Sequence, residues 1–201
     1  MKQPVIGVTG LPCAGKSLAA ELLADGAVNG VRGVLLKADD IGHAVLVRPD
    51  VVERLRKRFG AEAFRDDDPA AIRRAIAERV FASPGELAWL ETLVHPLVVA
   101  EVDRITGEAA GLRPVVVEAA LLFAANMDRN CDRVLVVEAD FEVRLARAAR
   151  RGWDRAELER RERRQLPLFE AAFSGPARGK LAFVRNDADD GRLAERIRAV
   201  L

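Results

Sequence analysis

The chain has 201 residues, half of them apolar, which is enough to bury one sizeable hydrophobic core and too few for two independent ones. Its 32 Lys and Arg side chains nearly balance 31 Asp and Glu side chains, so the net charge of +1 provides no general attraction for nucleic acid or an anionic membrane. Cys13 and Cys131 have neither metal-site spacing nor the density of a disulfide scaffold, and no apolar stretch is long enough to span a membrane. We therefore expect a cytoplasmic monomer or small homo-oligomer without nucleic-acid or membrane partners.

The first predicted strand spans residues 5–9 and is followed by a glycine-containing turn and a helical pattern that begins at Lys16. Four more buried strands are predicted, at residues 33–37, 114–118, 133–138 and 181–184. Helical patterns separate the strands, which is typical of a parallel sheet covered on both faces. The sequence therefore predicts an α/β fold, with a five-stranded parallel sheet flanked by helices and ligands at the carboxyl ends of its strands.

The turn after the first strand matches the pattern G-x-x-x-x-G-K-[ST] from Gly10 to Ser17. A glycine-rich turn can join a strand to a helix for backbone reasons alone, but here all four motif residues stand in register between a strand and a helix. In such a loop the backbone N–H groups and the positive end of the helix hold phosphates. Lys16 would reach the β- and γ-phosphates of ATP, and the Ser17 hydroxyl would join a magnesium shell.

This loop makes the predicted fold one of the P-loop NTPase type. The predicted nucleotide contacts are the loop residues and the residue after them: Gly10, Leu11, Pro12, Cys13, Ala14, Gly15, Lys16, Ser17 and Leu18. Pro12 has no N–H to donate, so this loop offers one donor fewer than a glycine-rich version. Cys13 is interpreted as a small residue that fills the loop.

Two segments are too long to be simple connections. Residues 41–111 are expected to form a helical substrate-binding subdomain, inserted into a nucleotide-binding core of residues 1–40 and 112–201. Residues 141–179 begin as a helix, become very rich in arginine and are predicted to form a lid. Most of the arginines between 160 and 164 are interpreted as solvated partners of Glu157, Glu159 and Glu162.

A series of short motifs continues along nearly the whole chain. The most specific stretch runs from Arg73 through Val80-Phe81 to His95-Pro96, because general P-loop kinases lack it. The other motifs are Ile6-Gly7-Val8-Thr9-Gly10, Lys37-Ala38-Asp39-Asp40-Ile41-Gly42-His43, Ala120-Leu121-Leu122-Phe123-Ala124, Arg144-Leu145-Ala146-Arg147, Gln165 and Asn186. Together these motifs resemble the dephospho-coenzyme A kinase family.

The resemblance implies that ATP phosphorylates the ribose 3′-hydroxyl of dephospho-coenzyme A, the last step of coenzyme A biosynthesis, with Mg2+ as cofactor. It implies that Arg147 is a lid arginine that neutralises charge on the phosphates, and that Asn186 lies near the adenine. The nearby Arg144, Arg150 and Arg151 are interpreted as surface residues or as substitutes for Arg147. The implied substrate contacts are Thr9, Asp39, Arg73, Phe81 and His95. For His95, a hydrogen-bonded role in the core is an equal alternative. Phe81 and Trp89 are favoured as packing residues of the helical subdomain, where Phe81 could also line the pantetheine groove.

Two acids follow predicted strands at the edge where ligands bind. Asp39 comes after the second strand and is predicted to accept the proton of the attacking hydroxyl, in agreement with the resemblance. Asp39 or Asp40 could instead cap a helix that starts at Ile41, and Asp40 is the favoured cap. Glu118 ends the third strand, where P-loop enzymes place an acid that holds magnesium through water.

The chain also departs from the family pattern. Lys37 replaces an aspartate, Ala120 a proline and Ala124 a glutamate, and Lys180-Leu181 replaces Ala-Asp. These changes leave two alternatives open, a paralogous kinase for another nucleoside or small alcohol and a nucleotide-binding pseudokinase. The groups needed for phosphoryl transfer are all present, which favours a divergent but active enzyme.

Overall fold

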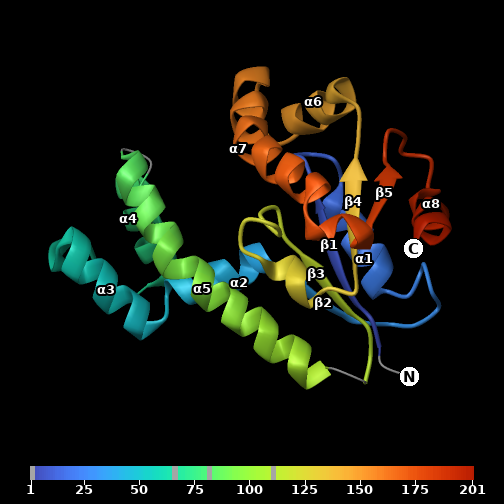
Figure 1. The fold of residues 1–201 in the computed structure, drawn as a ribbon. Coiled ribbons are helices and arrows are strands. Elements are labelled where there is room, and N and C mark those ends of the chain that lie inside the picture. The colour runs from blue at the N-terminus through green and yellow to red at the C-terminus, as the bar shows by residue number, and fades with distance from the viewer. Residues whose placement is uncertain (1–2, 65–67, 81–82, 110–111) are drawn as a thin grey trace. The chain divides into compact units, whose positions relative to one another are not determined.

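The computed structural model describes residues 3–64, 68–80, 83–109 and 112–201 (Figure 1). Its elements form two compact units. We call Met1–Lys37 together with Ile105–Leu201 the sheet unit, and Ala38–Arg104 the helical unit.

The sheet unit contains five parallel strands in the order β2-β3-β1-β4-β5. The strands are β1 (Val5–Gly10), β2 (Val34–Lys37), β3 (Val115–Glu118), β4 (Arg133–Glu138) and β5 (Leu181–Arg185). This confirms the predicted α/β fold. The strand β1, which leads into the P-loop, is the central one, so the loop emerges from the middle of the sheet.

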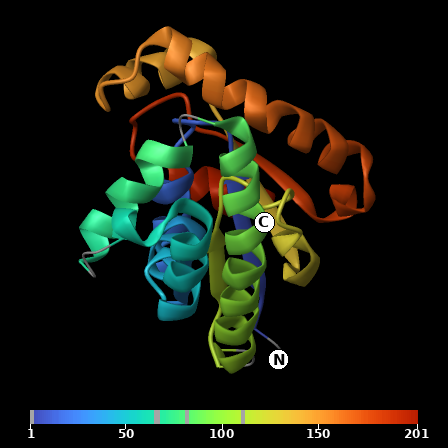
Figure 2. The same cartoon turned by 90° about the vertical axis from the view of Figure 1, so that its left-hand side faces the viewer.

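Four α-helices accompany these strands: α1 (Lys16–Ala24), α6 (Phe141–Ala149), α7 (Arg155–Ser174) and α8 (Leu193–Val200). The described residues also form three short 3-10 helices, η1 (Ala61–Phe64), η2 (Met127–Asn130) and η3 (Pro176–Lys180). The helices α1 and α8 cover the sheet core, where Val8, Leu135 and Ile197 are fully buried. Both ribbon views show α6 and α7 side by side (Figures 1 and 2), and these two helices make up most of residues 141–179, the segment that was predicted as a lid.

The helical unit consists of α2 (Ala38–Leu46), α3 (Pro49–Phe59), η1, α4 (Pro69–Val80) and most of α5 (Pro84–Ala109). Phe64 and Leu55 are buried in it, and Phe59 packs edge-on against Trp89 with ring centres 5.5 Å apart. Trp89 is thus a packing residue of this unit, as the sequence indicated. The helix α5 continues through Pro96.

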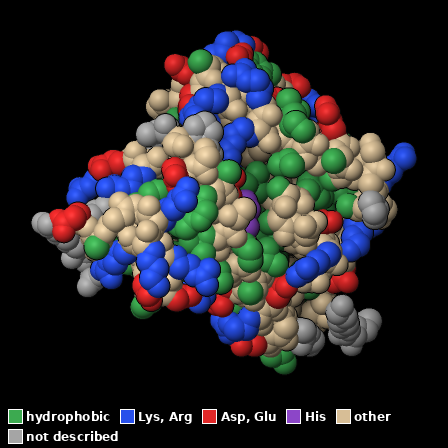
Figure 3. Space-filling model, turned by 60° about the vertical axis from the view of Figure 1, so that its left-hand side comes forward, with side chains coloured by type: hydrophobic (Ala, Val, Ile, Leu, Met, Phe, Trp, Pro, Cys, Tyr) green, Lys and Arg blue, Asp and Glu red, His purple; other side chains and the backbone are tan. Residues whose placement is uncertain are grey.

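Acidic and basic side chains are intermixed on the visible surface of the helical unit, on the left of Figure 3. Lys57 pairs with Glu53 at 2.6 Å, and Arg58 pairs with Glu86 at 2.9 Å. Exposed pairs of this kind contribute little to the stability of a fold, because water and salt screen them.

Among the helices of the described residues, none is both long enough and apolar enough to cross a membrane.

Candidate active site

The P-loop backbone depends on two glycines. Gly10 has φ +155°, and a Cβ there would lie 2.2 Å from the Val137 carbonyl oxygen in β4. Gly15 has φ +102°, and a Cβ there would lie 2.1 Å from Nδ2 of Asn186. Any side chain at either position would collide with its neighbour, so the loop can only follow this path with glycine.

The first turn of α1 is suited to an anion. Gly15 precedes the helix, and within the described residues no side chain caps this end and no acid stands in its first turn. The N–H groups at the start of a helix lack partners inside the helix, and the helix dipole adds positive potential there. The N-terminus of α1 therefore offers the N–H groups and the positive electrostatic potential that a phosphate group needs.

Three side chains of the motif and of β3 gather at this edge of the sheet. The ammonium of Lys16 donates to the Leu11 carbonyl at 3.3 Å, across its own loop. The Ser17 hydroxyl donates to Oε1 of Glu118 at 2.6 Å. The structure thus brings together a hydroxyl and a carboxylate that stand 101 residues apart in the sequence.

Asn186 braces the P-loop. Its side chain is buried, and its Nδ2 donates to the Ala14 carbonyl at 2.8 Å while its backbone N–H donates to the Glu138 carbonyl at 2.8 Å. The sequence indicated a residue near the adenine, whereas the bonds that the structure gives are to the loop itself. Contact with the nucleotide stays a prediction.

Arg147 extends from α6 to the same carbonyl, and its NH1 group donates to the Ala14 oxygen at 3.3 Å. Its NH2 group lies 3.4 Å from Asp189. The guanidinium is therefore beside the P-loop, and its action on phosphates as a lid arginine stays a prediction. Nothing in the local pattern around Asp189 singled it out as a partner.

A second carboxylate near this arginine is held in its charged form. The backbone N–H of Asp140 donates to Asp187 at 2.7 Å and lowers the pKa of that carboxyl, and Arg185 and Arg147 lower it further. Asp187 therefore remains negative at neutral pH. An anionic phosphate that approaches Arg147 must compete with Asp187 and Asp189 for the guanidinium.

Arg144 differs most from its predicted environment. It was interpreted as a surface residue or a substitute for Arg147, but its side chain is only 5% exposed and forms a two-bond ion pair with Glu162 of α7 at 2.9 and 3.1 Å. Glu162 was expected to pair within the solvated arginine cluster. That cluster exists, with Arg160 and Arg161 both paired to Glu157, but Glu162 faces Arg144 instead.

The other predicted contacts of the sheet unit have varied surroundings. Thr9 is fully buried in β1, and no described residue accepts or donates a hydrogen bond at its hydroxyl. Leu18 is 48% exposed on α1. Cys13 has φ +61° and packs with Ala148 of α6 and Leu158 of α7, in agreement with its interpretation as a loop filler.

Asp39 and Asp40 are both exposed and lie in the first turn of α2, which begins at Ala38. The helix that was expected to start at Ile41 thus begins three residues earlier. Neither acid caps a helix at Ile41, so that alternative is wrong. Acids in a first turn are favoured by the helix dipole, which explains why their pattern resembles a cap.

Lys37, which replaces a family aspartate, pairs with Glu21 of α1 at 2.8 Å. It ends β2 opposite Glu118 of β3 in the sheet register. An acid on α1 therefore balances the additional positive charge at this position.

The predicted substrate residues of the helical unit are Arg73, Phe81 and His95. Arg73 is half-buried on α4, and His95 is half-buried on α5. Phe81 lies outside the described residues. His95 is thus neither fully buried nor fully exposed, and its contact with substrate stays a prediction.

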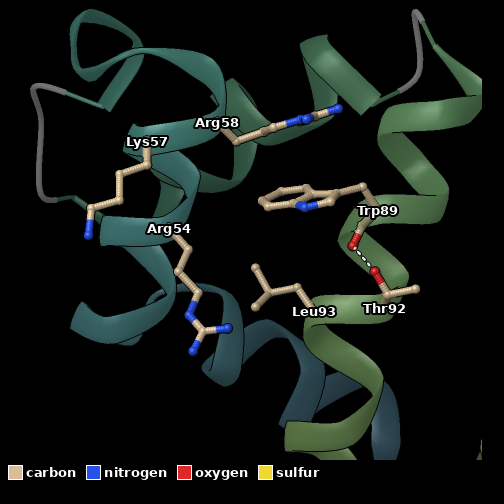
Figure 4. A pocket seen from close by; sticks show the side chains of 6 residues that line it. All are labelled: Arg54, Lys57, Arg58, Trp89, Thr92 and Leu93. Carbon is tan, nitrogen blue, oxygen red and sulfur yellow. Dashed lines mark hydrogen bonds between the residues drawn. The ribbon is translucent and has the colours of Figure 1, made fainter.

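A cavity of about 470 Å³ lies between α3 and α5, lined by Arg54, Lys57, Arg58, Trp89, Thr92 and Leu93 (Figure 4). Figure 4 shows Arg58 lying across the indole of Trp89, with 5.5 Å between its guanidinium carbon and the ring centre. Neither Arg73 nor His95 lines this cavity. The cavity is therefore separate from these two of the residues that the sequence predicted to bind substrate.

The P-loop follows the central parallel strand, Ser17 and Glu118 are hydrogen-bonded next to it, and Arg147 reaches it from α6. This arrangement is typical of a P-loop kinase. A family model described as dephospho-CoA kinase matches residues 4–173. The dephospho-CoA kinase of Chlorobaculum tepidum is 38% identical over 171 residues, covering 81% of this chain and 79% of the relative. That of Deinococcus radiodurans is 36% identical over 169 residues, covering 82% and 77%.

Solved structures share this fold. TT1252 from Thermus thermophilus superposes with a TM-score of 0.73 at 29% identity, covering 97% of this chain and 94% of that one. Dephospho-CoA kinase from Campylobacter jejuni, 20% identical, shares the fold with a TM-score of 0.63, covering 96% and 92%. The chain belongs to the dephospho-coenzyme A kinase family, whose members use ATP to phosphorylate dephospho-coenzyme A in the last step of coenzyme A biosynthesis.

Proposed function

We propose that Lys16, Arg147 and Asp39 divide the work of transferring the γ-phosphoryl group of ATP to the ribose 3′-hydroxyl. Lys16 and Arg147 place positive charge on the phosphates as negative charge builds up on the transferred group. Asp39 accepts the proton of the hydroxyl and orients it for in-line attack. The observation that supports this proposal best is the common contact of the P-loop with Lys16 and Arg147, through the Leu11 and Ala14 carbonyls.

Ser17 and Glu118 would hold Mg2+. Magnesium prefers oxygen ligands and keeps several of its waters, and a hydroxyl 2.6 Å from a carboxylate at the carboxyl edge of the sheet fits that preference. Ser17 would bind the ion directly and Glu118 through water. The bound ion would neutralise charge on the β- and γ-phosphates.

Glu118→Gln is expected to raise the Mg2+ concentration for half-maximal activity by about tenfold, with a much smaller loss at saturating Mg2+. The amide keeps the size of the side chain and can still accept from Ser17, but it lacks the negative charge that attracts a hydrated cation. A titration of the initial rate with MgCl2 measures the change. An unaltered Mg2+ dependence would show that Glu118 has a purely structural role.

The acceptor would bind through Asp39, Arg73, His95, Phe81 and Thr9. Arg73 is half-buried on α4, and a guanidinium that solvent can reach suits contact with the diphosphate of dephospho-coenzyme A. Phe81 would line the pantetheine groove. We also propose a cytoplasmic monomer or small homo-oligomer without nucleic-acid or membrane partners, in keeping with two cysteines that are both free and buried.

The arginine-rich helices α6 and α7 would act as a lid that closes over bound phosphates. We expect ATP with Mg2+ to slow trypsin cleavage between Arg144 and Arg164 by several-fold, because closure orders the segment. Mass spectrometry of the fragments locates the cleavage sites. The same digestion of Lys16→Ala should show no protection, and equal cleavage of the unaltered protein with and without nucleotide would contradict the lid.

A further inference from the structure

The buried ion pair between Arg144 and Glu162 is the least expected feature of the lid helices. The exposed fraction is 5% for the Arg144 side chain and 16% for Glu162, and two parallel N–H···O bonds of 2.9 and 3.1 Å join them. Removing two charges from water opposes folding, and a hydrophobic pair in the same place is often at least as stable. The pair is therefore better explained by the geometry that it imposes than by stability.

Arg144 is held from three sides. Its NH1 and NH2 groups bind Glu162, its Nε donates to the Ala139 carbonyl at 3.1 Å, and its guanidinium carbon lies 5.4 Å from the ring centre of Phe141. Ala139 belongs to the connection between β4 and α6. One side chain thus ties the start of α6 both to the sheet connection and to α7.

Arg147 stands three residues later on the same helix, and its NH1 group reaches the Ala14 carbonyl of the P-loop at 3.3 Å. The helix α6 therefore carries one arginine fixed to α7 and another directed to the P-loop. A helix advances 1.5 Å and turns about 100° per residue, so any rotation or slip of α6 would displace the Arg147 guanidinium. Cys13, Ala148 and Leu158 also pack together, but such apolar contacts are non-directional and do not fix the orientation of α6.

We propose that the Arg144–Glu162 pair positions Arg147 for phosphoryl transfer, by fixing α6 against α7. This inference rests on the proposed role of Arg147. Arg144 and Glu162 are positioning residues, and their effect reaches the reacting phosphate only through Arg147. An arginine–carboxylate pair with two hydrogen bonds is well suited to fixing one helix against another, because it specifies orientation as well as distance.

The experiment compares steady-state kinetics of Glu162→Gln, Arg147→Gln and the double variant. Glu162→Gln is expected to lower kcat by about 10- to 100-fold while the KM for ATP changes little, because a small misplacement of a catalytic group has effects of that size and the P-loop itself is untouched. Arg147→Gln should lower kcat at least as much. If Glu162 acts through Arg147, the double variant should be no slower than Arg147→Gln alone.

The chain supplies a matched control. Arg155 of α7 and Glu142 of α6 form an exposed ion pair of 3.1 Å between the same two helices. Glu142→Gln should leave kcat within about twofold of the unaltered enzyme, because exposed pairs contribute little. Melting curves show which variants fold. If Glu162→Gln does not fold, the double variant Arg144→Gln/Glu162→Gln takes its place, because it leaves no unpaired buried charge.

The outcomes separate the two claims. If Arg147→Gln strongly lowered kcat while Glu162→Gln kept the kcat of the control Glu142→Gln, only the positioning role would be overturned. Losses that multiply in the double variant would overturn it as well. An Arg147→Gln enzyme with unaltered kcat would refute the proposed role of Arg147 itself.

Discussion

Lys16→Ala is expected to lower turnover by at least about a thousandfold and to weaken ATP binding severely. Lys16 is the cation of the P-loop, and its ammonium is held at the loop by the Leu11 carbonyl, 3.3 Å away. In the complex with ATP the same ammonium would move to the β- and γ-phosphates, where no other described side chain of the loop carries a positive charge. A coupled assay of ADP release gives the rate, and calorimetric titration with ATP gives the affinity.

Lys37→Ala is the control for nucleotide affinity, because Lys37 is a lysine of the same unit that pairs with Glu21. It should bind ATP like the unaltered protein. If Lys16→Ala retained full turnover, the assignment of the loop as the phosphate site would be wrong.

Asp39→Asn is expected to lower kcat by about a hundred- to ten-thousandfold with little change in ATP affinity. The amide keeps the size and the hydrogen-bonding reach of the carboxylate but cannot take up the proton of the ribose hydroxyl. The side chain is exposed in the first turn of α2, directly after the strand that pairs with β3, so the substitution should not disturb packing. Single-turnover measurements at saturating ATP and dephospho-coenzyme A follow the chemical step.

Asp40→Asn is the matched control, since it makes the same change one residue along the same helical turn. It should lose little activity and about 0.3–1 kcal/mol of stability, from the weaker interaction with the helix dipole. If Asp40→Asn proved crippling and Asp39→Asn mild, the base would be Asp40.

The sheet could be predicted closely because its physical signal is local. The buried parallel strands appear in the sequence as short apolar runs such as Val115-Val116-Val117, and one predicted strand, 133–138, has the observed bounds of β4. The P-loop was predictable for a similar reason, since its required glycines lie within a few residues of each other. Both features depend on neighbours in the sequence.

The start of α2 was misplaced because an acid at a helix cap and an acid in a first turn produce the same pattern. Asp39 and Asp40 fit both, and only the backbone shows that the helix begins at Ala38. The brace between Asn186 and Ala14 joins residues 172 apart, and no local pattern predicts such a contact.

The burial of Arg144 had a weak signal that composition concealed. Phe141, Arg144 and Ala148 recur at helical spacing, which places the arginine on the apolar face of α6. In a segment so rich in arginine, the exposed members of the cluster dominate the pattern. Periodicity rather than charge density therefore identifies the arginine that matters for the packing of α6.

The central claim is that this chain phosphorylates dephospho-coenzyme A, and an acceptor panel tests it most directly. ADP release would be measured with ATP and Mg2+ in the presence of dephospho-coenzyme A, of several nucleosides or of small alcohols, with mass spectrometry of the products. Among these acceptors, we predict turnover only with dephospho-coenzyme A, and a product that carries one added phosphate on the ribose 3′-hydroxyl. Turnover with a different acceptor instead, or ATP binding without any turnover, would contradict the account.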